Sequence, residues 1–207
     1  EAKMAKTSLY RKRIELVLPP LLLLLLAVTF SGCQAESNHE DLLLKEEQLS
    51  TIESIYNQDR PKVLEALHIE ESDISQSTLP GGWDLSEPVS FEGTEFSEIL
   101  LFDVSAETFY GVRFICYFEN AEELSGLAED ILEKANTIYG EPSTYPGLPN
   151  RLTSENFSKE LSESMNQGTL GDWREEWSLG EKTRCTLSAS VVENNVAFLS
   201  LEYSLSQ

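Results

Sequence analysis

The sequence predicts an α+β fold, in which an antiparallel sheet of about six strands has helices packed against it and a helical hairpin comes first. Three observations predict it. Segments of alternating apolar and polar residues occur in two groups of three, and a long amphipathic segment separates the groups. No strand-helix-strand spacing typical of a parallel sheet occurs. Residues 41–207 are long enough for a single domain with a sizeable core.

The helical hairpin is expected at the start of this domain. Asp41–Tyr56 should form its first helix, because apolar residues recur there at helical spacing. These residues are Leu42, Leu49, Ile52 and Tyr56. Pro61 suits the first helical position, so a second, shorter helix should begin there. Val63, Leu64 and Leu67 give that helix its apolar side.

The first group of strands follows a segment, 72–82, that is expected to be a loop because it ends in the turn signal Pro80-Gly81-Gly82. The strand signals are Val89–Phe91, which is weak, Phe96–Val104 and Phe109–Phe118. In the last of these, alternate residues should share one face of the sheet. They are Tyr110, Val112, Phe114, Cys116 and Phe118. Residues 105–108 should turn the chain between the two longer strands.

The clearest helix is Ala121–Tyr139, whose apolar residues form one stripe. Asn120 can cap its first turn, and Glu123 stands three positions later, as in a capping box. Gly140 and Pro142 then favour the end of the helix.

Three further strands close the chain after a proline-bearing connection that can hold a helix at Ser154–Asn166. The strands are Trp173–Leu179, Thr183–Val192 and Val196–Tyr203. Glu193-Asn194-Asn195 is the turn signal of a hairpin between the last two. Each half of the domain therefore has helices followed by three strands. This order is compatible with a structural duplication, although no residue-level repeat accompanies it.

The charge of the chain is strongly uneven. Residues 33–207 hold 10 Lys and Arg against 34 Asp and Glu, so their net charge is near −24. Such a surface repels phosphate backbones and anionic lipid headgroups, which excludes nucleic acid as a partner. It is typical of a strongly solvated surface, with an affinity for cations or basic proteins as the alternative. No calcium-binding or phosphate-binding loop occurs, and no cofactor is expected.

Residues 1–32 have the layout of a secretory signal peptide. A basic stretch ending in Arg11-Lys12-Arg13 precedes the uncharged run 16–30, and small residues follow the run. The run is shorter than the roughly 20 apolar residues of a membrane-spanning helix. Pro19-Pro20 would also break such a helix near its start. An uncleaved membrane anchor is therefore disfavoured.

Phe30-Ser31-Gly32-Cys33 resembles the lipobox of bacterial lipoproteins, with Phe30 in place of the usual Leu. The resemblance implies that Cys33 receives a diacylglycerol with acyl chains such as palmitate and becomes the N-terminus after cleavage. The lipid would then hold the protein on the extracytoplasmic face of the cell membrane, with residues 33–40 as a flexible tether. The alternative is ordinary secretion, in which cleavage after Cys33-Gln34-Ala35 removes the cysteine.

The body of the chain resembles uncharacterised exported lipoproteins of Firmicutes. The resemblance rests on a helix that ends in Tyr139-Gly140-Glu141-Pro142, a strand bearing tryptophans and a final hairpin. It covers roughly residues 40–204 and implies a location and a fold, but no activity.

Few side chains have the spacing that catalysis or metal binding requires. The two histidines are His39 and His68, and no His-x-x-x-His or Cys-x-x-Cys spacing occurs, so no metal site is expected. No Gly-x-Ser-x-Gly turn occurs, which argues against a serine hydrolase. Cys116 and Cys185 fall on apolar strand faces and could form a disulfide if their strands are neighbours. Two buried free thiols are the favoured alternative.

Trp173, Glu175 and Trp177 form the most suggestive group, because strand alternation puts them on one face. If that face is open, the acid would lie between two indoles that can stack on a sugar. Tyr145 and Trp83 could line the same cleft. The favoured alternative is that both tryptophans lie in the core and that Glu175 lies at the exposed end of the strand.

Three functions are therefore compatible with the sequence. A non-enzymatic domain that binds a protein or peptide is favoured, because the sequence contains no catalytic motif. A carbohydrate- or cell-wall-binding module that uses Trp173, Trp177 and Tyr145 is the alternative. A carboxylate-dependent hydrolase is the weakest hypothesis, because 36 acids produce many chance pairs.

Overall fold

The computed structural model describes residues 42–143, 150–192 and 196–205. In these residues the chain forms four α-helices and an open, eight-stranded antiparallel sheet, so the predicted α+β class is confirmed. The predicted signal peptide, the tether and the lipidation site Cys33 lie outside the described residues. Tyr145 and the hairpin signal 193–195 also lie outside them.

Each of the four predicted helices is present. They are α2 (Glu46–Ser54), α3 (Arg60–Leu67), α4 (Ala121–Tyr139) and α5 (Phe157–Gln167), and a 3-10 turn, η1 (Glu71–Asp73), follows α3. The helix α2 begins later than the apolar spacing predicts, because Leu42–Leu44 form a buried segment that precedes it. The side chain of Asp59 caps α3, and the side chain of Asn120 accepts a hydrogen bond from the Glu122 amide at the start of α4 (2.9 Å).

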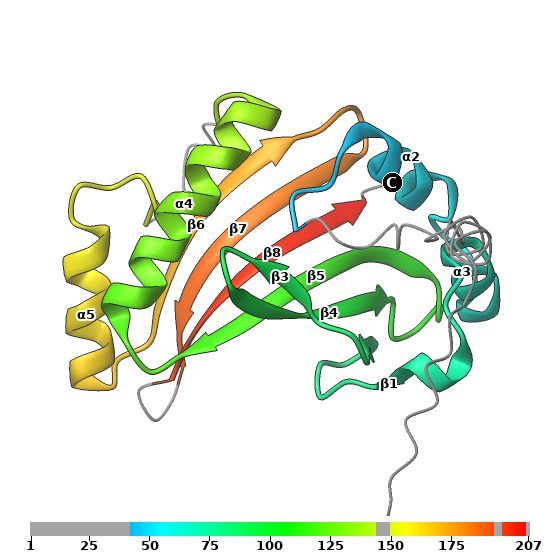
Figure 1. The fold of residues 1–207 in the computed structure, drawn as a ribbon, viewed down its shortest axis with the longest axis horizontal. Helices are drawn as coiled ribbons and strands as arrows, with labels where there is room; N and C mark the ends of the chain where they lie inside the picture. Colours follow the sequence, from blue (N-terminus) through cyan, green and yellow to red (C-terminus); the bar gives the residue numbers. More distant parts are fainter. Residues whose placement is uncertain (1–41, 144–149, 193–195, 206–207) are drawn as a thin grey trace, which may run out of the picture. The chain divides into compact units, whose positions relative to one another are not determined.

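One strand lies within the segment 72–82, which the turn signal predicts to be a loop, and another begins at its last residue. The eight strands are β1 (Ile74–Gln76), β2 (Gly82–Leu85), β3 (Val89–Phe91), β4 (Thr94–Phe102), β5 (Phe109–Phe118), β6 (Gly171–Ser178), β7 (Thr183–Val191) and β8 (Ala197–Leu205). Their order in the sheet is β1-β2-β4-β5-β8-β7-β6, with β3 paired to β4 (Figure 1). The predicted number of about six is therefore too low, since β1 and β2 lie in and at the end of the segment predicted to be a loop.

The turn between β1 and β2 does follow the predicted signal. The Gly82 amide donates to the Leu79 carbonyl across it (2.9 Å). Gly81 has a φ of +77°, and a Cβ built there would lie 2.1 Å from the backbone oxygen of Phe102. Only glycine fits this position, so the residue that ends the hairpin turn also lets β2 approach β4.

A β-bulge between β4 and β5 changes which side chains face the core. Phe102 pairs with Phe109, but Leu101 pairs with Gly111, which leaves Tyr110 as an extra residue. Phe109 is therefore fully buried in the main core, whereas Tyr110 packs on the opposite face of the sheet. The prediction that Tyr110 shares the core face is wrong, because the bulge reverses the alternation at this point.

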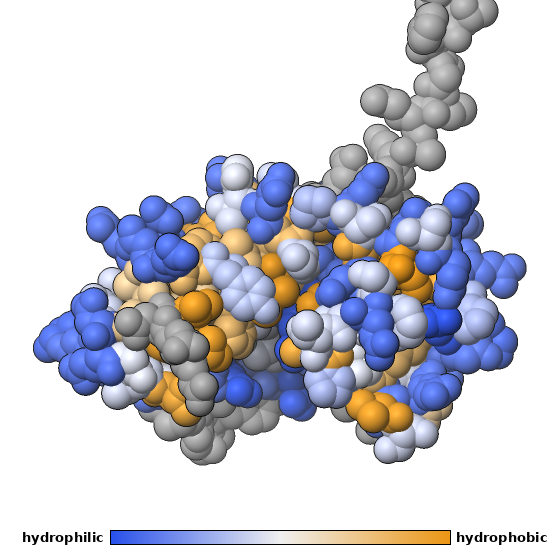
Figure 2. Space-filling view, turned by 90° about the horizontal axis from the view of Figure 1, so that it is seen from below, coloured by the Kyte–Doolittle hydropathy of each residue, from blue (hydrophilic) through white to orange (hydrophobic). Residues whose placement is uncertain are grey.

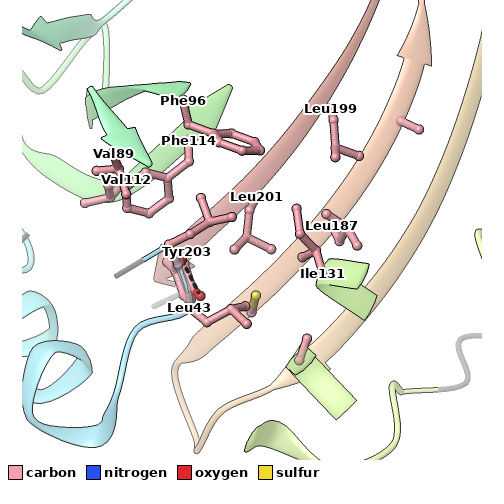
Figure 3. Packing of buried hydrophobic residues seen from close by; sticks show 14 of the residues in the cluster. Leu43, Val89, Phe96, Val112, Phe114, Ile131, Leu187, Leu199, Leu201 and Tyr203 are labelled. Carbon is pink, nitrogen blue, oxygen red and sulfur yellow. Dashed lines mark hydrogen bonds between the residues drawn. The ribbon is translucent and has the colours of Figure 1, made fainter. Parts of the chain in front are cut away.

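The main core lies between the sheet and its helices. The helix α4 packs on β5, β7 and β8 through an apolar stripe, and α5 contacts α4, β6 and β7. Ile131 of α4 lies near Leu187 and Leu201 of the sheet, and all three are 0% exposed (Figure 3). Complete burial of such an aliphatic side chain stabilises the fold by about 1.5–3 kcal/mol.

The two halves of the domain meet at the centre of the sheet. Each half has two helices followed by strands, and the last strands of the halves, β5 and β8, pair antiparallel over residues 111–118 and 197–204. In Figure 1, α4 and α5 lie at one end of the sheet, and α2 and α3 lie at the other. This arrangement is the one that a duplication would give, and the duplication stays a hypothesis.

The opposite face of the sheet is mostly polar. Arg113 and Glu202 form an ion pair across β5 and β8, and Ser188 and Ser200 share a hydrogen bond of 2.9 Å. A small apolar cluster interrupts these side chains and consists of Ile99, Leu101 and Ile115 with Leu79, Tyr110 and Phe198 beside them. Figure 2 shows a different side of the molecule, turned by 90° from Figure 1 and seen from below, where hydrophilic and hydrophobic side chains are mixed.

Candidate functional site

Trp173, Glu175 and Trp177 lie on one face of β6, as predicted, and that face points into the core. Trp173 is 2% exposed, Glu175 0% and Trp177 1%, and the intervening residues of β6 point away from the core. The favoured reading of the two tryptophans as core residues therefore agrees with the structure. Its second part is wrong, because Glu175 lies at the buried centre of β6 and not at an exposed end.

Both indoles hold helices against β6. Trp173 Nε1 donates to the Glu160 carboxylate of α5 (3.1 Å), and Trp177 Nε1 donates to the Gly140 carbonyl at the end of α4 (2.9 Å). The indole of Trp177 also packs edge-on against Tyr139, with 6.4 Å between ring centroids. With their N–H groups bonded and their faces packed, neither indole presents a stacking face to a sugar.

Glu175 is held by four donors from one loop. Arg151 donates from Nε to both carboxylate oxygens (3.0 Å each) and also forms an ion pair through its terminal nitrogen. Thr153 donates from its backbone amide (3.1 Å) and from Oγ1 (2.7 Å). A carboxylate has about four lone-pair sites, so these donors saturate it. The hydrogen bonds with Glu175 also raise the pKa of Arg151, which keeps the guanidinium charged.

We call Trp173, Glu175, Trp177 and their bonded partners the β6 cluster. Its carboxylate has no remaining site for a substrate proton, and the structure gives the cluster a role in holding α4, α5 and the loop 150–153 together. Trp83, a candidate for the same cleft, lies on β2, near the other edge of the sheet from β6. There the Arg60 guanidinium lies over its ring, 3.9 Å from the centroid.

The two described cysteines are free thiols on strands that are not neighbours. Cys116 of β5 pairs with Leu199, and Cys185 of β7 pairs with Tyr203, so β8 separates them. Two strand spacings alone amount to about 10 Å, which exceeds the reach of a disulfide of roughly 7 Å between Cα atoms. Burial also raises the pKa of the Cys185 thiol, which makes it a poor nucleophile.

A pocket opens at the other end of the core, between the helical hairpin and the sheet. Its volume is about 260 Å³. The segment leading into α2 and α2 itself contribute Leu44, Glu47, Gln48, Thr51 and Ile52; α3 contributes Ala66 and Leu67; β4 and β5 contribute Glu98, Val112 and Phe114. We call this the hairpin pocket. Its inner wall consists of buried side chains, whereas Glu47, Thr51 and Ala66 are exposed and form its mouth.

One acid lies on the inner wall of the hairpin pocket. Glu98 is in phase with Phe96 and Leu100 on β4, pairs across the sheet with Phe114, and is only 2% exposed. The strand prediction did not single out Glu98. Strand alternation could have identified it. Glu98 lies two residues from Phe96 and two from Leu100, so its side chain must point to the same face as theirs.

The wall of the hairpin pocket is fastened by two tyrosine hydroxyls. Tyr203 accepts a hydrogen bond from the Leu44 amide (3.1 Å) and donates to the Leu42 carbonyl (3.2 Å). Tyr139 of α4 donates to the Leu44 carbonyl (2.8 Å) and lies 2.7 Å from the Tyr203 hydroxyl. Burial raises the pKa of Tyr203 well above its usual range, so its hydroxyl stays protonated. Figure 3 shows Tyr203 beside Leu43 of this segment.

No histidine of the described residues belongs to the hairpin pocket or to the β6 cluster. His68 is exposed at the end of α3, where it adopts a left-handed conformation with a φ of 58°. His39 lies outside the described residues. Among the residues that the structure describes, no group of three or more His, Cys, Asp or Glu is placed to hold a metal ion. No helix in the same part of the chain has the length and apolar content to cross a membrane.

Comparisons with family models, curated proteins and solved structures found no match to this chain.

Proposed function

We propose that this chain is a bacterial lipoprotein of the extracytoplasmic membrane face, with a non-enzymatic domain that holds a small, largely apolar ligand in the hairpin pocket. The observation that carries the proposal is the pocket itself, since a volume of about 260 Å³ opens between α2, α3 and the sheet. Pockets with apolar walls and few polar groups are the usual ligand sites of proteins.

The size of the hairpin pocket supports a small ligand. A cavity of roughly 150 Å³ can bind benzene, so a pocket of about 260 Å³ suits one aromatic ring or a short alkyl chain. Burial contributes about 0.8 kcal/mol per methylene, so an eight-carbon chain gains at most roughly 6 kcal/mol. That gain corresponds to a Kd in the tens of micromolar, before the entropy cost of association weakens it.

The β6 cluster does not support the carbohydrate or hydrolase alternatives. The indoles of Trp173 and Trp177 are buried, and four donors occupy Glu175. Trp173, Glu175 and Trp177 are therefore not placed to contact a substrate, and we propose neither alternative.

Lipid attachment at Cys33 would place the hairpin pocket close to the membrane. Leu42, at the start of the described domain, is nine residues after Cys33. A fully extended chain spans about 3.5 Å per residue, so this separation cannot exceed roughly 30 Å. Leu44 lines the pocket and is fixed to Tyr203 and Tyr139. The lipid has to provide the attachment, since an acidic domain is repelled by anionic headgroups.

The first test fills the mouth of the pocket. In the 1H–15N NMR spectrum of the purified domain, residues 41–207, 1-octanol should shift the amides of Val112 and Phe114. In Ala66→Trp the indole should occupy the pocket and weaken octanol binding at least tenfold. The matched control is Ala106→Trp, which changes an exposed alanine of the β4–β5 turn that does not line the pocket. Unchanged binding in Ala66→Trp, or no binding to the wild type, would contradict the proposed site.

The second test concerns the anchor. Cys33→Ala should release the protein into the medium or leave it unprocessed, because no acyl chain can then be attached. Fractionation of cells that express the two forms measures this directly. A variant that is processed and membrane-bound like the wild type would refute the lipoprotein assignment, and it would leave the pocket proposal intact.

A further inference from the structure

We infer that the ligand of the hairpin pocket is a small apolar amine, bound as its alkylammonium ion with the charged group against Glu98. This inference rests on the proposed function and adds the chemical class of the ligand. The two features that carry it are a carboxylate on the inner wall of an apolar pocket and the strong negative charge of the domain around that pocket.

Glu98 places a polar side chain on the apolar inner wall of the hairpin pocket. A buried carboxylate loses most of its hydration, and an apolar side chain between Phe96 and Leu100 would pack there at no such cost. Glu98 also takes part in an interaction within the chain, and its carboxylate borders the pocket in addition. In surroundings of low dielectric constant, an ammonium group gains more from a carboxylate than it does at the surface.

The charge of the pocket selects the sign of the ligand. The described residues that line it include two acids, Glu47 at the mouth and Glu98 on the inner wall, and eight uncharged residues. The domain around it carries a net charge near −24. This field attracts cations toward the mouth and repels fatty-acid anions of the same length. An apolar anion is therefore the ligand that this pocket rejects most strongly.

The shape of the pocket selects a small molecule. Ile52, Leu67 and Phe114 supply apolar walls around the carboxylate, and the enclosed volume is about 260 Å³. A short alkyl chain fills such a space and leaves its terminal ammonium group within reach of the carboxylate. A neutral alcohol of the same length keeps the apolar contacts but lacks the charge, so it is the matched reference ligand.

The test compares three ligands of one chain length: octylamine, 1-octanol and octanoate, each titrated at pH 7 into the purified wild-type domain, residues 41–207. The amide shifts of Val112 and Phe114 give the three Kd values. We expect octylammonium to bind at least tenfold more tightly than octanol, and octanoate to bind at least tenfold more weakly. Equal Kd values for octylammonium and octanol would overturn the inference while the pocket function stands. No binding by any of the three would overturn the proposed function itself.

A pair of variants assigns the effect to one carboxylate. Glu98→Gln keeps the shape of the side chain and removes its charge, so the Kd values of octylammonium and octanol should converge to within threefold. Glu95→Gln is the matched control, because Glu95 is exposed on the same strand and does not line the pocket. It should keep the tenfold preference. A preference that survives in Glu98→Gln, or disappears in Glu95→Gln, would show that the general surface charge attracts the amine and would overturn the role of Glu98.

Discussion

Two glutamates of this protein are both buried on the core face of the sheet, but the groups around their carboxylates differ. Glu175 of β6 and Glu98 of β4 both lie on the core face of the sheet, at 0% and 2% exposure. Arg151 and Thr153 saturate the carboxylate of Glu175, whereas Glu98 lines a pocket with a mouth at the surface. Burial of a charge therefore does not identify a functional site. The distinguishing feature is whether space for a ligand remains beside it.

The helices above the two glutamates explain this difference. Over β6, the loop 150–153 reaches Glu175, and the indoles of Trp173 and Trp177 hold α5 and α4 in place. Over β4, the shorter helices α2 and α3 present small residues, Thr51 and Ala66, at the pocket mouth. Small side chains above an apolar strand face leave a volume unfilled, and this volume is the hairpin pocket.

The largest effect on stability should come from breaking the saturated pair. Arg151→Ala leaves the Glu175 carboxylate buried without its cation, which should lower the free energy of unfolding by about 3 kcal/mol. Urea denaturation of the two proteins measures this. Arg174→Ala is the control, since Arg174 forms a more exposed pair with Asp172 and should cost less than about 1 kcal/mol. A loss in Arg151→Ala no larger than in the control would mean that Glu175 does not depend on Arg151.

A smaller effect is expected at the segment that walls the pocket. Tyr203→Phe removes the hydroxyl that bonds Leu44 and Leu42, which should cost about 1–2 kcal/mol. The loss should be local, so the Leu44 amide should exchange its hydrogen faster than the core amides of β7. Native-state hydrogen exchange measures the exchange rates of the Leu44 amide and of the β7 amides separately. Equal acceleration throughout the sheet would show that the hydroxyl supports the whole core instead of this segment.

The smallest effect on stability is expected at the second glutamate. Glu98→Gln removes a buried charge but keeps the shape of the side chain and its capacity to form a hydrogen bond within the chain, so the free energy of unfolding should change by less than about 1 kcal/mol. Urea denaturation again provides the measurement. A loss as large as that in Arg151→Ala would place Glu98 in the same structural class as Glu175 and would remove the contrast between them.

Local patterns in the sequence predict most of the elements. The four helices follow from apolar spacing and capping residues, and six strands follow from alternation. The strands β1 and β2 are missed because they are short, flank the turn signal 80–82 and have no alternation of buried and exposed residues. The bulge at Leu101/Phe102 is equally invisible, because it depends on how β5 pairs with β4 and not on either strand alone.

The two glutamates show where prediction from sequence ends. Alternation correctly put Glu175 on one face with Trp173 and Trp177, but its partner Arg151 is 24 residues away on a loop. No local pattern reports such a pairing. The inward direction of Glu98 could be predicted, because Glu98 alternates with Phe96 along β4. The pocket beside it could not be predicted, because it depends on how α2 and α3 pack on β4 and β5.

The central claim is that Glu98 faces a ligand and Glu175 does not. The most direct measurement is the 1H–15N spectrum of the wild-type domain during titration with octylamine. The account predicts saturable shifts of the Val112 and Phe114 amides, while the indole Nε1–H signals of Trp173 and Trp177 stay in place. Saturable shifts of the two indoles, with no change at Val112 and Phe114, would contradict it and would move the ligand site to the β6 cluster.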